Sequence, residues 1–208
     1  MEAVLPDAVS KPVSIRIVEP PDGTDRYVGG YLANMLGGGG FLTRGSLRNV
    51  AHEKLRIAAP HPVFNLALDQ VRNGGSFESA QMTGWRYLVL AGGKVAATVE
   101  LAATSAGEPP RFSRITDSWM AQATLRAIRF AEKSPGAKGG NFVLGMLRAP
   151  SIQAHALWLR HEKGDGRSDL FLPLKRGQAA PASRREMDSD GFMTWLVEAR
   201  AGISRGNR

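Results

Sequence analysis

Apolar and polar residues alternate along several stretches of the chain, a pattern typical of β-strands. The clearest case is a pair of stretches, 85–91 and 94–102, separated by Gly92-Gly93. Glycine tolerates the positive φ of a two-residue turn, so this pair predicts an antiparallel hairpin. Further strands are predicted at 12–19, 142–147, 152–160 and 170–174.

The hairpin has a predicted register that follows from counting outwards from the turn. Leu88 then lies opposite Ala97, and Arg86 lies opposite Val99. Because side chains alternate between the two faces of a strand, Leu88 and Val99 share one aliphatic face. We expect this face to pack against the helix that contains Leu125.

Apolar residues at helical spacing predict three helices. The first spans 62–73, where a proline suits the first turn and an Asn-Gly pair suits the end. The second spans 116–133, where a threonine or an aspartate caps the start. The third spans 189–203 and aligns its apolar residues in one stripe: Phe192, Trp195, Leu196, Ala199 and Ile203.

The order of these elements predicts an α+β fold, because strands and helices do not alternate strictly. We expect a mainly antiparallel sheet of about five strands with helices packed on it, plus the C-terminal amphipathic helix. The chain divides into a single domain over 1–174, a polar linker over 175–188 and the helix at 189–203. Within the domain, a glycine-rich segment near 29–45 has no apolar period and is expected to be mobile.

Charge is unevenly distributed along the 208 residues, whose net charge is +8. Residues 1–100 carry 10 basic and 9 acidic side chains, whereas residues 101–208 carry 17 and 10. A basic excess favours anionic partners. The predicted contacts for a nucleic acid or another polyanion are the basic residues on the polar side of the second helix, namely Arg126, Arg129 and Lys133.

Candidate chemistry is sparse. The chain has no cysteine, which excludes disulfides, thiolate metal sites and a cysteine nucleophile. The spacing of its four histidines does not suggest a metal site, and no nucleotide-binding or catalytic motif is complete. We therefore expect no metal and no cofactor. A hydrolase with a scattered site around His155, His161 and Asp169 stays open as an alternative.

These features favour a non-enzymatic binding or assembly module that acts through protein–protein contacts. The stripe of the 189–203 helix is too apolar to stay in water, so we expect it to bind a partner protein, a second copy of the chain or its own domain. A polyanion-binding protein and a hydrolase are the alternatives. The first residues lack the pattern of a secretory leader, and no stretch reads as a membrane span, so we expect a cytoplasmic protein without membrane contact.

Overall fold

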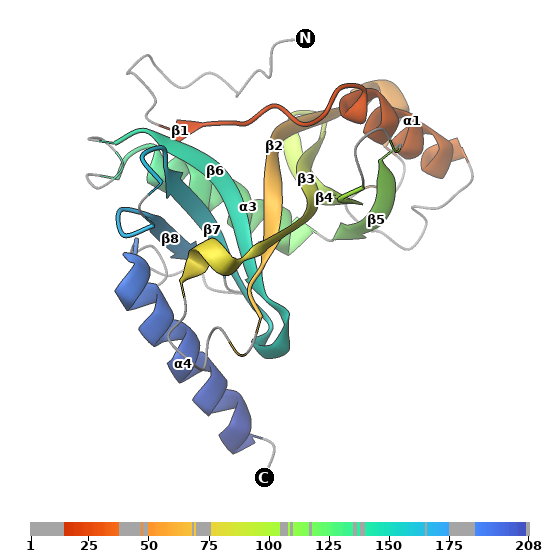
Figure 1. Cartoon of the computed structure of the whole chain (residues 1–208). Coiled ribbons are helices and arrows are strands. Elements are labelled where there is room, and N and C mark those ends of the chain that lie inside the picture. The colour runs from red at the N-terminus through yellow and green to blue at the C-terminus, as the bar shows by residue number, and fades with distance from the viewer. Residues whose placement is uncertain are drawn as a thin grey trace.

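The structure is a computed structural model that describes residues 15–37, 47, 50–67, 69, 76–104, 108, 110–116, 118–134, 137, 140–164, 166–174 and 186–206. Across these residues, one eight-stranded sheet is accompanied by three α-helices (Figure 1). The sheet is mainly antiparallel, which confirms the predicted α+β class. The strands number eight rather than the predicted five or so.

The strands are β1 Ile15–Arg16, β2 Leu55–Asn65, β3 Gln81–Ala91, β4 Lys94–Ala102, β5 Arg111–Thr116, β6 Phe142–Ala149, β7 Ala154–His161 and β8 Leu170–Pro173. The helices are α1 Thr24–Gly37, α3 Ser118–Ala131 and α4 Ser189–Gly206, with short 3-10 helices η1 His52–Lys54, η2 Phe77–Ser79 and η3 Pro150–Ile152. In the sheet the order is β5-β4-β3-β2-β6-β7-β8, and β1 pairs with β6. Strand β6 pairs in parallel with β1 and β2, and all other neighbouring strands, including β6 and β7, are antiparallel.

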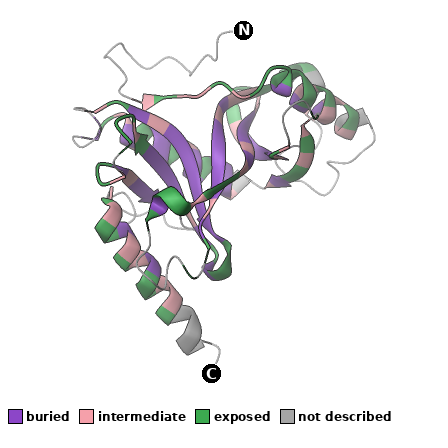
Figure 2. Ribbon diagram, viewed as in Figure 1, coloured by how far each residue is buried: buried purple, intermediate pink, exposed green. Residues whose placement is uncertain are grey.

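Helices cover both faces of the sheet. On one face, α3 lies mainly against β4 and packs on side chains of β2, β3, β6, β7 and β8 around Ala121 and Ile128. On the opposite face, α1 covers the β3–β4 end around Tyr87, and α4 packs near β8 around Phe171. Figure 2 shows the central strands as almost entirely buried, whereas the helices present exposed residues outwards. The core therefore has two layers, separated by the sheet.

The predicted hairpin is present as β3 and β4, and its Gly92-Gly93 turn has positive φ at both residues. Next to the turn the predicted register holds, but an irregularity at Val89 shifts the rest by one residue. Arg86 consequently lies opposite Glu100, and the predicted pair with Val99 is wrong. A bulge inserts one residue into a ladder, and counting from the turn does not reveal it.

The shift also changes which residues meet α3. Leu88 belongs to the apolar cluster under α3, as expected, and Leu125 lies half-buried at the margin of that cluster. Val99 instead packs on the opposite face, with α1. Our assignment of Val99 to the α3 face was therefore wrong.

The helix predicted at 62–73 is wrong at its start, because Pro62–Asn65 form the end of β2. Hydrogen-bonded pairing with β3, and with β6 from Val63 onwards, outweighs the helical spacing of the apolar residues. A proline is tolerated at position 62 because β2 has only one partner strand there. Residues 68 and 70–75 lie outside the described part of the chain.

The segment predicted to be mobile, 29–45, begins as helix, since α1 extends to Gly37. Gly29 and Gly30 each cost the helix about 1 kcal/mol relative to alanine. Val28 and Leu32 are fully buried against the sheet, and their burial offsets that cost. Residues 38–46 lie outside the described residues, as does most of the predicted linker.

The remaining elements agree more closely with the sequence. The helix predicted at 116–133 is α3, the helix predicted at 189–203 is α4, and the three strands predicted from 142 to 174 are β6, β7 and β8. The strand predicted at 152–160 begins later, at Ala154, because Ile152 belongs to η3. Strand β5 had not been predicted.

Candidate functional site

The apolar stripe of α4 is divided between the chain's own core and the surface. Phe192 and Leu196 are buried against the domain, and the Phe192 ring stacks on Phe171 at 4.5 Å between centroids. Trp195 is half-buried and stacks on Phe192 at 5.3 Å. Two of the residues predicted to bind a partner thus belong to the domain's own core.

Beyond Leu196 the helix continues to Gly206 and extends away from the sheet (Figure 1). Ala199 still packs at the margin of the apolar cluster that contains Phe171 and Phe192, but Val197 is 45% exposed. The side chain of Ile203 lies outside the described residues. Of the two partner residues predicted beyond Leu196, Ala199 is the one whose side chain is described, and it packs against the domain. Val197, an exposed apolar residue of this second half of α4, had not been predicted.

The three predicted polyanion contacts, Arg126, Arg129 and Lys133, are exposed on the outer side of α3. None of them forms an ion pair within the described part of the chain. Their charges are therefore available to an anionic partner, and polyanion binding stays a prediction.

The three residues of the hydrolase alternative are not brought together. The buried carboxylate of Asp169 accepts hydrogen bonds from the Trp158 indole and from the backbone N–H of His161, both at 2.7 Å. The His161 ring packs edge-on against Phe142. His155 lies at the other end of β7.

A buried cluster of charged side chains lies on the sheet face that carries α3. We call it the arginine cluster and define it as Arg86, Glu100, Arg114 and Arg148. Glu100 on β4 lies directly opposite Arg86 on β3 and directly opposite Arg114 on β5. The three side chains form a row across three strands, and Arg148 reaches this row from β6.

The Glu100 carboxylate accepts hydrogen bonds from all three guanidiniums. Arg86 donates its Nε to Oε1 at 2.7 Å, and its Nη2 donates to the same oxygen. Arg114 Nε and Arg148 Nη1 both donate to Oε2, at 2.8 and 2.9 Å. Burial opposes ionisation of Glu100, but the positive charges of Arg86 and Arg114 prevail and lower its pKa below the ordinary value.

Arg148 is held in place by neutral groups as well. Its Nε donates to Asn65 Oδ1 at 3.2 Å, and its Nη2 donates to Thr83 Oγ1 at 3.3 Å. Only 10% of its side chain is exposed, whereas Arg114 is 49% exposed. Arg114 therefore forms the solvent-facing side of the arginine cluster, and Arg86 forms its most buried part.

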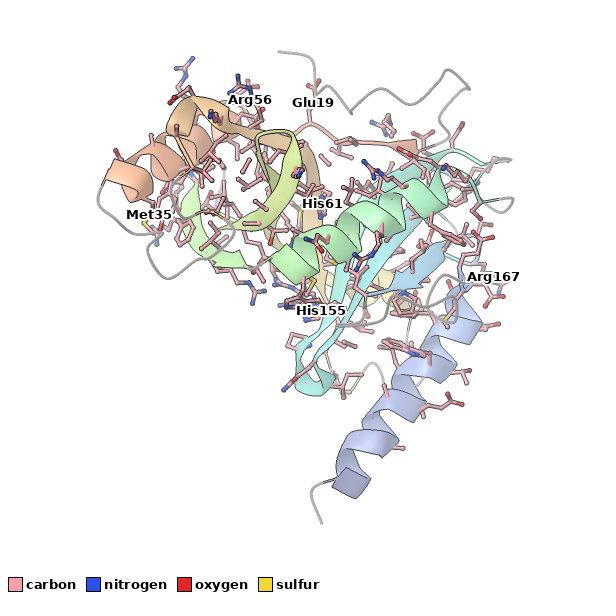
Figure 3. The ribbon with its side chains drawn as sticks, turned by 180° about the vertical axis from the view of Figure 1, so that it is seen from behind. Glu19, Met35, Arg56, His61, His155 and Arg167 are labelled. Atoms are coloured by element: carbon pink, nitrogen blue, oxygen red, sulfur yellow. The ribbon has the colours of Figure 1, made fainter. Side chains whose placement is uncertain are left out.

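Two histidines, His61 and His155 (labelled in Figure 3), are paired across the sheet with members of the arginine cluster. His61 lies opposite Arg86 just after a bulge in β2, at which Ala59 has a φ of 48°. His61 Nδ1 donates to the Ala59 carbonyl at 2.7 Å, so Nε2 is the hydrogen-bond acceptor of the neutral ring. His155 lies opposite Arg148 in the ladder between β6 and β7.

Three buried nitrogens around the arginine cluster have no hydrogen-bond partner among the described residues: His61 Nε2, Arg86 Nη1 and His155 Nδ1. Burial lowers the pKa of His61 to about 4, and the charge of Arg86 acts in the same direction. Burial also lowers the pKa of His155 to about 4, aided by Arg86 and Arg114. Both histidines are neutral at pH 7, so three arginines and one glutamate leave the cluster with a charge of +2.

These histidines make the fold sensitive to acid. Because their pKa falls from 6.5 in the unfolded chain to about 4 in the folded one, the unfolded state binds more protons between these values. The free energy of unfolding should therefore fall as the pH drops from about 6.5 towards 4. Urea unfolding at pH 7 and pH 5 measures this loss.

The double variant His61→Gln, His155→Gln should lose less stability than the wild type over that pH interval. The control His161→Gln, at the far end of β7, should lose as much as the wild type. Equal losses in all three proteins would contradict the assignment of the acid sensitivity to the two buried histidines.

Sequence reasoning missed the arginine cluster because the predicted register placed Arg86 opposite Val99. One signal was present: Arg86 and Glu100 interrupt two runs, 81–91 and 95–102, whose other residues are apolar or neutral. Charged residues are almost never fully buried unless they are paired. Two opposite charges on the two strands of one hairpin therefore favour a register in which they meet.

Within the described ranges, no group of three or more His, Asp or Glu side chains is placed to hold a metal ion. Nor does any helix in those ranges have the length and apolar character needed to cross a membrane. No protein-family model matches the chain, and neither a curated protein nor a solved structure shows significant similarity to it.

Proposed function

We propose that the protein is a non-enzymatic assembly module that associates with a second copy of itself through the outer half of α4. The observation that carries this proposal is the division of α4, whose first turns are docked on the domain while the rest extends beyond it (Figure 1). The docked part holds the projecting part in a defined direction.

The projecting half of α4 would be stabilised by packing against a partner. Helices shorter than about 12–15 residues are only marginally stable in water without packing. Beyond Leu196 the helix has ten residues. The main contacts of α4 as a whole with the domain are made to η3 and β8. Val197 is a large apolar residue on its exposed side. A partner that covers this half would supply the missing packing.

A second copy of the chain is the simplest such partner. Most soluble oligomers are homo-oligomers, and twofold dimers are the commonest among them. In a twofold dimer the same half-helix from each subunit would cover the other, so no complementary surface is required elsewhere.

The proposal predicts that Val197→Glu abolishes self-association without unfolding the domain. A charged residue at the centre of an apolar interface loses its water and has no partner there. The mass of the full chain in solution, measured by light scattering over a wide concentration range, should fall from dimer to monomer. The circular dichroism spectrum should stay unchanged.

Met82→Glu is the matched control, because Met82 is also apolar and is 41% exposed, on β3 rather than α4. This variant should remain dimeric. A wild-type chain that is monomeric at all concentrations would overturn the proposal, and so would a Val197→Glu chain that still forms a dimer.

A further inference from the structure

We infer that the arginine cluster is a binding site for a doubly charged oxyanion, a phosphate group carried either by inorganic phosphate or by a phosphomonoester. This site lies on the α3 face of the sheet, and the inference does not depend on the proposed self-association through α4.

The arginine cluster carries more positive than negative charge. Glu100 is the only carboxylate that pairs with Arg86, Arg114 and Arg148 in the described part of the chain. Buried charges are costly unless they are compensated. Both neighbouring histidines are neutral and supply no negative charge. A ligand with a charge of −2 would neutralise the excess of +2.

Two of the arginines meet at one oxygen, Glu100 Oε2. Arg114 and Arg148 come from strands on opposite sides of β4, and both donate to this one oxygen. Two positively charged groups are therefore held close together. Arg114 uses only its Nε within the described residues, so both of its terminal nitrogens keep their N–H groups for another acceptor. Phosphate oxygens suit this planar fork.

Hydrogen bonds within the protein orient the arginines before any ligand binds. Asn65 and Thr83 fix the guanidinium of Arg148, and Glu100 fixes those of Arg86 and Arg114. Side chains that are already ordered lose little entropy on binding. Glu100 is thus a positioning residue, which holds three donors in place without contacting the anion.

The charge of the cluster also selects among phosphates. A phosphomonoester carries a charge of about −1.5 to −2 at pH 7, whereas each phosphodiester of a nucleic acid carries a single negative charge. Because the site is partly buried, we expect a single phosphate group of the ligand to enter it, from the exposed side of Arg114. Inorganic phosphate and a monoester therefore fit better than an internal phosphodiester.

The test is isothermal titration of the full chain at constant ionic strength with three probes: inorganic phosphate, O-phosphoserine and a single-stranded oligothymidylate without terminal phosphates. The affinity for phosphate or for phosphoserine should exceed the affinity for the oligonucleotide when the latter is expressed per phosphate group. Binding to phosphate alone would identify the free anion as the ligand, and tighter binding to phosphoserine would identify a monoester.

Arg114→Gln should weaken binding by about tenfold or more, because it removes charge-assisted hydrogen bonds. Arg111→Gln is the matched control on the same strand: Arg111 is 73% exposed and lies 3.9 Å from Glu108, outside the arginine cluster. This control should bind like the wild type. If Arg114→Gln does not fold, the wild-type thermal midpoint serves instead, and phosphate should raise it above its value in chloride.

Several results would overturn the inference. If the binding heats or the thermal midpoints are the same in phosphate as in chloride, phosphate acts only through ionic strength and the site does not bind it. Wild-type affinity in Arg114→Gln would place the site elsewhere. Tighter binding of the oligonucleotide than of either small probe would favour a polyanion surface such as the outer side of α3.

Discussion

Replacing Glu100 by glutamine should destabilise the protein by about 3–5 kcal/mol, because it leaves the buried guanidiniums of Arg86 and Arg148, and the half-exposed one of Arg114, without their shared negative charge. Glutamine keeps the size of the side chain, so the loss reports on charge rather than on packing. Urea unfolding at pH 7 measures this change in free energy.

Glu162→Gln is the control for this prediction. Glu162 also pairs with an arginine, Arg16, at 2.9 Å, but both side chains are substantially exposed. Exposed ion pairs contribute little, so this variant should lose less than about 1 kcal/mol. If the two variants differ by less than experimental error, Glu100 does not stabilise the fold by neutralising the buried arginines.

Replacing Phe171 by alanine should lower the free energy of unfolding by about 3–5 kcal/mol, because it leaves a cavity at the centre of a cluster of aromatic side chains. Phe171 is fully buried and packs against Phe77, Trp158 and Phe192 with centroid distances of 4.5, 5.8 and 4.5 Å. Because Phe192 belongs to α4, we expect the helix to lose its contact with the domain. Thermal unfolding and hydrogen exchange of the α4 amides measure the two effects.

Phe112→Ala provides the comparison. Phe112 is half-buried on β5 and stacks on Tyr31 of α1, at the opposite end of the sheet. Its loss should destabilise the protein less and should leave exchange in α4 unchanged. Faster exchange in α4 for both variants would mean that α4 responds to global stability rather than to Phe171.

The arginine cluster and the outer half of α4 make different demands on the protein. The cluster is hydrogen-bonded around Glu100 and mostly buried, and we propose it as a site for a small anion. The outer half of α4 projects from the domain and suits a protein surface (Figure 1). Variants at Arg114 and Val197 affect separate surfaces, so phosphate binding and self-association can be tested independently.

Local patterns in the sequence were sufficient to predict part of this fold. Gly92-Gly93 between two apolar strands predicted the hairpin, because a two-residue turn requires positive φ. Helical spacing predicted α3 and α4, since a helix on a core needs one apolar face. The α+β class followed from the order of these elements.

Only the tertiary structure decided the rest. Pro62–Asn65 became strand because β3 and β6 lie beside them, and Gly29 became helical because Val28 and Leu32 are buried on the sheet. The register shift between Val89 and Leu90 brought Arg86 opposite Glu100, and β5 and β6 added Arg114 and Arg148. These features depend on contacts between distant segments. A local pattern records the preference of a residue for helix or strand, but it does not record which distant residues will lie beside it.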